Sequence, residues 1–97
     1  MKKISWYEKY LLTLEESLTI KEIMNLRGVG QSTAVEIRKQ AIEFCLMNNI
    51  FVGAQKTPTM AVLQVTGYSQ EYYYNQMLKE AEVKKIVQGG ELVHASV

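Results

Sequence analysis

The residues with the most usable chemistry follow one another between positions 26 and 33. They are two glycines and three hydrogen-bonding side chains: Gly28, Gly30, Gln31, Ser32 and Thr33. The pattern predicts a short apolar helix, a glycine turn, and a second helix that begins at the hydroxyl of Ser32. Two helices joined by so tight a turn form a platform that nucleic-acid-binding domains use repeatedly.

Groups that could catalyse a reaction are few. The single histidine, His94, follows Gly89 and Gly90 in a predicted tail, which is a poor place for a positioned acid or base. One cysteine, Cys45, and one histidine cannot form a structural zinc site. The glycine turn lacks the lysine of a phosphate-binding loop. We therefore expect no enzymatic activity, no metal site and no cofactor.

The composition is that of one small globular domain covering residues 1–97. Hydrophobic residues make up 47% and charged residues 22% of the chain, which argues against wholesale disorder. The net charge of +1 is low for a dedicated nucleic-acid binder, although local clustering can still supply a basic face. Neither a signal peptide nor a membrane span is expected, and the lone cysteine suits a reducing compartment, so a cytoplasmic location is predicted.

Start and stop signals predict an all-α fold of about five helices. Two capping boxes, a serine or threonine followed three residues later by glutamate, begin the first two helices. The expected helices run from Ser5 to about Leu14, from Thr19 to Gly28, from Ser32 to about Asn49, from Thr57-Pro58 to Val65, and from Ser69 to about Val87. Residues 10–14 also suit a strand, and residues 50–56 are predicted as a connector with a brief strand near 50–52. Residues 89–97 are expected to be a loose tail.

Three consecutive tyrosines occur within the fifth predicted helix. Successive residues of a helix point about 100° apart, so the three rings cannot share one environment. Tyr74 is expected in the core because it is in line with Met77, Leu78 and Ala81. Tyr73 is expected at the edge of the core. Tyr72 shares a face with Asn75, Gln76 and Lys79 and is a candidate for a phosphate or base contact, although packing in the core or in a dimer is the favoured interpretation.

The second half of the chain repeats the pattern of the first. Gly67 lies 39 residues after Gly28 (67 − 28), and residues 62–70 match residues 23–31 in their apolar, amide and glycine positions. The two units, residues 19–49 and 57–88, would each be a short helix, a glycine turn and a longer helix. This period is typical of two-helix repeats and predicts an internal duplication, unless two unrelated helical hairpins merely look alike.

The first unit resembles the helix-turn-helix of bacterial and phage regulators and excisionases. Ile23 and Leu26 take the apolar places of the scaffold helix, the turn is Gly28-Val29, and Ile37 is the inward anchor of the recognition helix. The second unit is similar but has Gln76 where the family has an apolar anchor.

This resemblance implies binding of double-stranded DNA by a small transcriptional regulator or recombination accessory protein of a phage or mobile element. Base contacts would come from Gln31, Ser32, Thr33, Glu36 and Gln40. Phosphate contacts would come from Arg27, Gly30, Arg38, Lys39 and Lys56. The second unit would contribute Gln70, Tyr72, Asn75, Gln76 and Lys79. A homodimer, or two hairpins acting in tandem, is expected, because a single DNA-binding hairpin of this size seldom reaches specific affinity.

Two alternatives stay open. The turn also resembles the helix-hairpin-helix motif, in which backbone amides hold a phosphate without reading bases. The residues that fit this motif are Leu26, Gly28, Val29, Gly30, Thr33, Ala34 and Ile37. The second alternative is a protein–protein module of the antirepressor or inhibitor type, with a partner bound through the fifth helix. Near-neutral charge and the tyrosines and methionine of that helix favour it.

Overall fold

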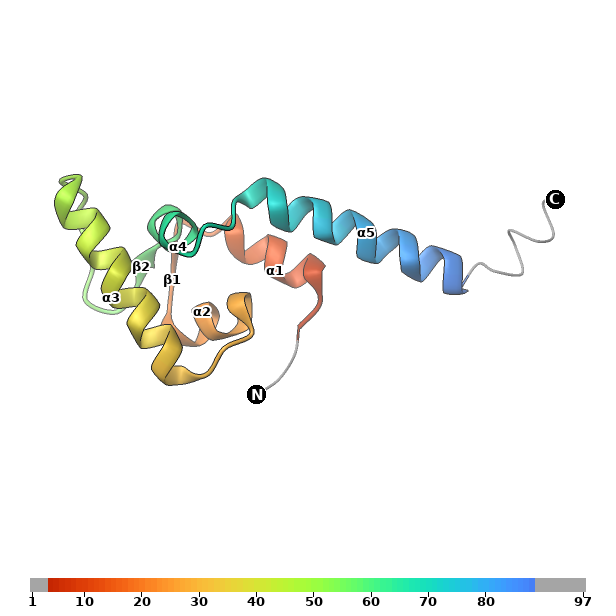
Figure 1. Cartoon of the computed structure of the whole chain (residues 1–97), viewed down its shortest axis with the longest axis horizontal. Coiled ribbons are helices and arrows are strands. Elements are labelled where there is room, and N and C mark those ends of the chain that lie inside the picture. The colour runs from red at the N-terminus through yellow and green to blue at the C-terminus, as the bar shows by residue number, and fades with distance from the viewer. Residues whose placement is uncertain (1–3, 89–97) are drawn as a thin grey trace.

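The computed structural model describes residues 4–88, which form five helices and two short strands (Figure 1). In chain order the elements are α1 (Trp6–Thr13), β1 (Ser17–Leu18), α2 (Ile20–Arg27), α3 (Gln31–Met47), β2 (Thr57–Pro58), α4 (Thr59–Thr66) and α5 (Gln70–Gln88). The predicted all-α class of about five helices is confirmed. The predicted tail and His94 lie outside the described residues. Within residues 4–88, no helix has both the length and the apolar character needed to cross a bilayer.

Local capping signals begin the first two helices, as predicted. The hydroxyl of Ser5 accepts a hydrogen bond from the backbone N–H of Glu8 at 3.1 Å. The hydroxyl of Thr19 accepts one from the N–H of Glu22 at 3.2 Å. In each box the carboxylate of the glutamate also accepts a hydrogen bond from the backbone N–H of the capping residue. Each box thus supplies partners for N–H groups that no carbonyl within the helix can reach.

Two predicted helix starts are wrong. Helix α3 begins at Gln31, because extended Gly30 is its N-cap, and Ser32 lies within the first turn. Thr57 and Pro58 adopt extended backbone and pair with β1, so α4 begins only at Thr59. The short strand is therefore β2, at residues 57–58, and residues 50–52 lie in the loop before it.

The strands β1 and β2 form a small antiparallel ladder that joins the two halves of the chain. Leu18 lies opposite Thr57, and both side chains are fully buried. The N–H of Thr59 extends the ladder by donating to the carbonyl of Glu16 at 3.0 Å. This pairing holds the start of α4 beside the segment that leads into α2.

The predicted period of 39 residues recurs in the helix boundaries, but the packing does not repeat. Helices α2 and α4 have 8 residues each, and both end at a glycine in the left-handed conformation. Helix α3 packs on α2 and on α4, whereas α5 packs along α1 (Figure 1). The first unit is thus a closed helical hairpin, and the second unit has the same elements in an open arrangement.

The prediction for the tyrosines of α5 is wrong. Tyr73 is fully buried, whereas Tyr74 is 42% exposed. Helix α1 lies on the face of α5 that carries Tyr73, and the ring of Trp6 packs on that of Tyr73 with 6.1 Å between centroids. Tyr74 meets Tyr10 beside this contact, at 5.3 Å between centroids. The line through Tyr74 and Leu78, expected in the core, is left at the surface.

The glycines of the first turn offer a matched pair of substitutions. A Cβ would meet nothing within 4 Å at either Gly28 or Gly30, but only Gly28 has a positive φ, of 63°. Gly28→Ala is therefore expected to lower the free energy of unfolding by about 1–2 kcal/mol. Gly30→Ala should change the free energy of unfolding by less than about 0.5 kcal/mol. Alanine is a poorer N-cap than glycine, but it also makes the unfolded chain less flexible, and the two effects offset each other. Urea unfolding measures both, and equal losses would contradict the assignment of strain to Gly28.

Candidate nucleic-acid interface

The hairpin of α2 and α3 is closed by a short, well-bonded turn. The N–H groups of Gly28 and Val29 both donate to the carbonyl of Met24, which ends α2. Leu26 of α2 and Ala34 of α3 are fully buried behind the turn. The contacts between α2 and α3 behind the turn therefore hold the start of α3 against α2.

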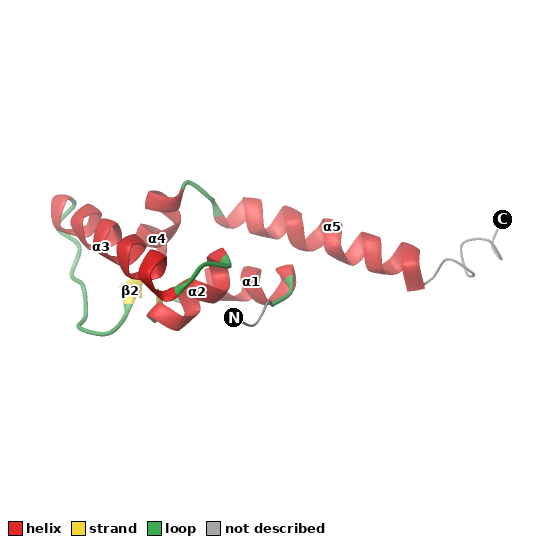
Figure 2. Ribbon diagram, turned by 60° about the horizontal axis from the view of Figure 1, so that its bottom comes forward, coloured by secondary structure: helices red, strands yellow, loops and turns green. Residues whose placement is uncertain are grey.

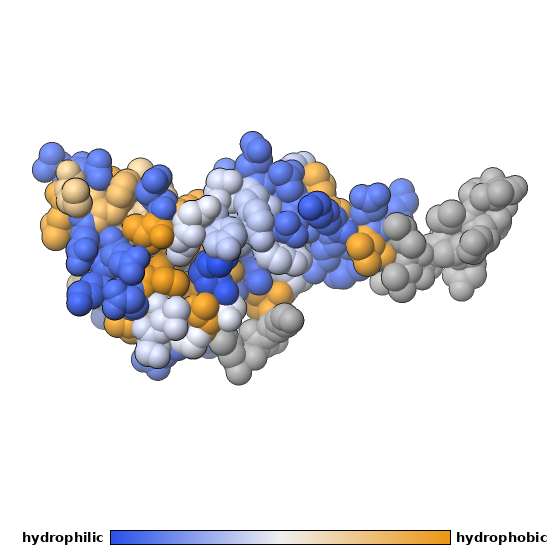
Figure 3. Space-filling view, viewed as in Figure 1, coloured by the Kyte–Doolittle hydropathy of each residue, from blue (hydrophilic) through white to orange (hydrophobic). Residues whose placement is uncertain are grey.

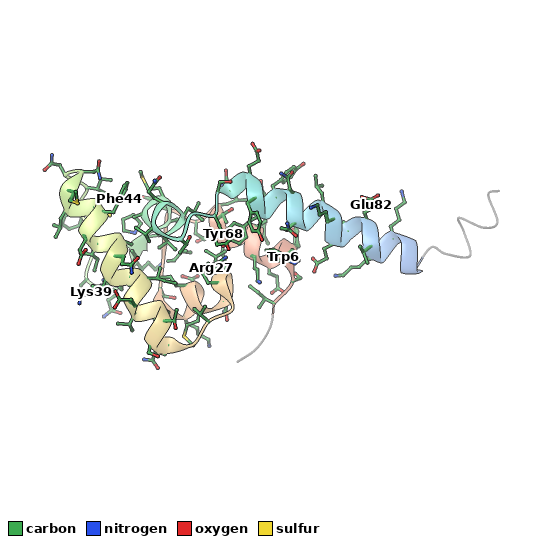
Figure 4. The ribbon with its side chains drawn as sticks, in the orientation of Figure 1. Trp6, Arg27, Lys39, Phe44, Tyr68 and Glu82 are labelled. Carbon is green, nitrogen blue, oxygen red and sulfur yellow. The ribbon has the colours of Figure 1, made fainter. Side chains whose placement is uncertain are left out.

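The five residues predicted to contact bases all lie exposed on the first three turns of α3. They are Gln31, Ser32, Thr33, Glu36 and Gln40. Gln40 donates to the carboxylate of Glu36 at 3.4 Å, so these two side chains lie together on the helix. Lys39 projects from the same helix on the side turned away from α1 and α5 (Figure 4). Ser32, Thr33, Glu36 and Gln40 lie within about 100° of one another around the helix and are accessible together, whereas Gln31 points to one side of them at the helix start.

Charge is not uniform along this face. Lys39 lies between Glu36 and Glu43, and all three are exposed. A helix rises 1.5 Å per residue, so Glu43 lies about 18 Å from Gln31 along the axis. The first turn carries no acidic residue and no side chain that caps it. Its free N–H groups and the positive end of the helix dipole make this turn the part of α3 best suited to a phosphate.

Arg27, predicted to contact phosphate, is held by aromatic side chains. Its guanidinium donates to the hydroxyl of Tyr73 at 3.0 Å and lies 3.9 Å from the centre of the Tyr68 ring. Burial lowers the pKa of Arg27, but the combined effects of Tyr73 and Tyr68 outweigh it, so the pKa is raised. Arg27, Tyr68 and Trp6 gather where α1, α2 and the start of α5 meet (Figure 4). Arg27 therefore links the first hairpin to α5.

Arg38 and Lys56 lie at the loop that follows α3. The guanidinium of Arg38 donates to the carbonyls of Gly53 and Ala54 at 3.3 and 3.0 Å. This loop returns from the C-terminal end of α3 to β2 (Figure 2). Lys56 is exposed near its end. Arg38 thus fixes the loop against α3.

The predicted contacts of the second unit do not gather on one outward face. Gln70 donates to the carbonyl of Thr13 at 3.3 Å, which ties α5 to the end of α1. Tyr72 is half-buried against Trp6 and Tyr68, and Gln76 is also half-buried. Asn75 and Lys79 are exposed. Because Gln70 bonds to α1 and Tyr72 and Gln76 are half-buried, the predicted contact residues of α5 do not form one exposed face as most of those of α3 do.

An exposed apolar surface was not predicted. Four large side chains at the C-terminal end of α3, in the following loop and on α4 form what we call the α3-end patch: Leu46, Met47, Phe51 and Met60. Their exposed fractions are 68, 83, 89 and 57%. Figure 3 shows apolar side chains gathered at this end of the molecule. Helical periodicity could have indicated Leu46 and Met47, which point away from buried Cys45, but Phe51 resembled part of a strand.

An open groove adjoins the α3-end patch. It has a volume of about 670 Å³, and Phe51, Met60 and Leu63 contribute apolar walls. Glu15, Glu16 and Lys56 contribute charged groups. The groove is therefore lined by both apolar and charged side chains.

The arrangement offers hydrogen-bond donors and acceptors on a rigid helix. Within the described residues, no group of three or more histidine, cysteine, aspartate or glutamate side chains could hold a metal ion.

Comparison of the chain with protein-family models, with curated proteins and with solved structures finds no match.

Proposed function

We propose that the chain is a small double-stranded DNA-binding protein of the cytoplasm that recognises sequence through the N-terminal half of α3. It would act as a transcriptional regulator or a recombination accessory protein. The observation that carries this proposal is the closed α2–α3 hairpin, which presents Gln31, Ser32 and Thr33 on an exposed and uncapped helix start.

The dimensions and chemistry of α3 support insertion into the major groove. A helix with its side chains is about 10–12 Å across, and the major groove is about 12 Å wide. The amide of Gln31 can bind adenine at two points, and the hydroxyls of Ser32 and Thr33 can pair with several bases. Gly30 precedes the free N–H groups of α3 and leaves space for a phosphate beside them.

Two basic residues complete the proposed surface: Lys39 and Lys56. Arg27 and Arg38 are left out because their guanidinium groups are already engaged, that of Arg27 by Tyr68 and Tyr73 and that of Arg38 by the carbonyls of Gly53 and Ala54. The residues of α5 are left out because they do not share the outward face of α3.

The salt dependence of binding tests the proposal. A duplex selected from a random library should bind more weakly as salt rises, with a logarithmic slope of about −2 per copy for two phosphate contacts. Lys39→Gln should reduce the magnitude of this slope by about 1, because one released counterion is lost. Lys79→Gln is the matched control and should leave the slope unchanged. Absence of binding at low salt, or equal effects of the two lysine variants, would contradict the proposal.

The α3-end patch favours a second candidate function, the binding of another protein. Four large apolar side chains more than half exposed on one surface are typical of an interaction site. The adjoining carboxylates of Glu15 and Glu16 favour a partner segment that is apolar with basic residues at its edge. A variant with a substituted patch should separate the two functions, because it would lose protein binding and keep its affinity for DNA.

A further inference from the structure

One face of α5 is left uncovered in the part of the chain that the structure describes. It carries five exposed residues, which we call the α5 seam: Glu71, Tyr74, Leu78, Ala81 and Lys85. They alternate by three and four residues, the spacing by which one helix packs along another. Helix α1 covers the face that carries Tyr73, and the seam borders that face at Tyr74, whose ring meets Tyr10 of α1.

Apolar side chains of α1 widen this surface. Tyr7, Leu11 and Leu14 repeat at helical spacing and are 55, 40 and 54% exposed. Tyr10, their neighbour on α1, meets Tyr74 across the pair of helices. The three residues therefore lie on the same side of the α1–α5 pair as the seam.

The second half of α5 extends beyond α1. The carboxylate of Glu80 accepts hydrogen bonds from the N–H groups of Trp6 and Tyr7 at 3.1 and 3.4 Å, so α1 begins beside Glu80. The rest of α5 continues as a single helix (Figure 1). A helical segment of this length is marginal in water without packing, so a partner that covers it would stabilise it.

We propose that a second copy of this chain covers the seam, through antiparallel contact of the two α5 helices with Leu78 on the two-fold axis. Glu71 and Lys85 lie equally far from Leu78, at seven residues on either side (78 − 71 and 85 − 78). The antiparallel register therefore places Glu71 of each copy beside Lys85 of the other. A parallel register would place like charges together at both ends, which disfavours it.

The seam is thus complementary to itself about one axis, as a symmetric dimer requires. Tyr74 and Ala81 flank Leu78, so in this register Tyr74 of each copy lies beside Ala81 and Glu82 of the other. The contact lies on the α1–α5 side of the molecule, while α3 lies at the other end (Figure 1). Self-association can therefore be measured without DNA, and its failure would leave the proposed DNA contacts untouched.

Sedimentation equilibrium over a range of protein concentrations tests the dimer. The wild-type protein is expected to associate to a dimer at micromolar concentration. Leu78→Lys should raise the dissociation constant at least 100-fold, because two lysines would meet at the axis. Val83→Lys is the matched control: Val83 is 58% exposed and lies about 140° around the helix from Leu78. A monomeric wild type at several hundred micromolar, or equal effects of the two variants, would overturn the proposal.

A charge exchange tests the register. Glu71→Lys and Lys85→Glu should each weaken association about five- to tenfold, because each creates two repulsive pairs in the dimer. The double variant should recover the wild-type dissociation constant, since both pairs are restored in reverse. Circular dichroism confirms that the helices persist in each variant. Failure of the double variant to recover association would overturn the antiparallel register.

Discussion

Replacement of Tyr73 by alanine is expected to lower the free energy of unfolding by about 3–5 kcal/mol, a large part of the stability of a domain this size. The ring is fully buried and packs on Trp6 from α1 and on Tyr72. Its hydroxyl also accepts the hydrogen bond of Arg27 at the end of α2. Loss of the ring would therefore leave a cavity where three helices meet. Urea unfolding monitored by circular dichroism measures the change.

The adjacent tyrosine is the matched control. Tyr74 is 42% exposed and follows Tyr73 directly, so Tyr74→Ala removes a side chain of the same size from the same helix. Measured in dilute protein, where self-association is absent, Tyr74→Ala should cost about 1 kcal/mol or less. Similar losses in the two variants would contradict the packing of α1 on the Tyr73 face.

Substitution of the hydroxyl alone separates its contribution from that of the ring. Tyr73→Phe keeps the buried ring but removes the acceptor for the half-buried guanidinium of Arg27. The expected loss is about 1–2 kcal/mol, because a charged group loses its hydrogen bond away from water. Burial raises the pKa of Tyr73, against the opposing effect of Arg27, so the hydroxyl stays neutral at physiological pH.

Features set by neighbouring residues could be predicted from the sequence. The boxes at Ser5 and Thr19 and the helix ends at Gly28 and Gly67 depend on bonds within one turn of chain. The outward face of α3 could also be predicted, because helical periodicity alone separates Ala34 from its exposed neighbours. Local structure therefore positions most of the proposed DNA surface.

Features set by distant residues could not be predicted. Thr57 and Pro58 carry an ordinary helix-start signal, but they form a strand because they pair with β1, which lies about 40 residues earlier in the chain. Arg27 is indistinguishable from a free surface cation until Tyr68 and Tyr73 are brought to it. The same holds for α5, which has one apolar face with Tyr73 and another with Tyr74 and Leu78. Helical periodicity does not distinguish the two faces, so the tyrosine that is buried depends on which face α1 packs against.

The largest functional effect is expected from a double substitution at the start of α3. Gln31→Ala with Ser32→Ala should weaken binding to a selected duplex at least about 30-fold, because each of two good base contacts contributes about 1–3 kcal/mol of discrimination. Binding to unselected DNA should change little, since the phosphate contacts remain. Fluorescence anisotropy with both duplexes measures the two affinities. An equal loss on both duplexes would contradict base recognition by this turn and favour the phosphate-holding hairpin.

Substitution of the α3-end patch completes the comparison. Leu46→Ser with Met47→Ser changes two exposed residues of the same helix, about 24 Å along its axis from Gln31. The selected duplex should bind this variant as tightly as the wild type, because the patch lies outside the proposed groove contact. If the patch variant loses biological activity while its DNA affinity is intact, the apolar surface has a function of its own. If the patch variant loses biological activity and the Gln31 and Ser32 variant keeps it, the result would contradict base recognition and favour protein binding as the function of this chain.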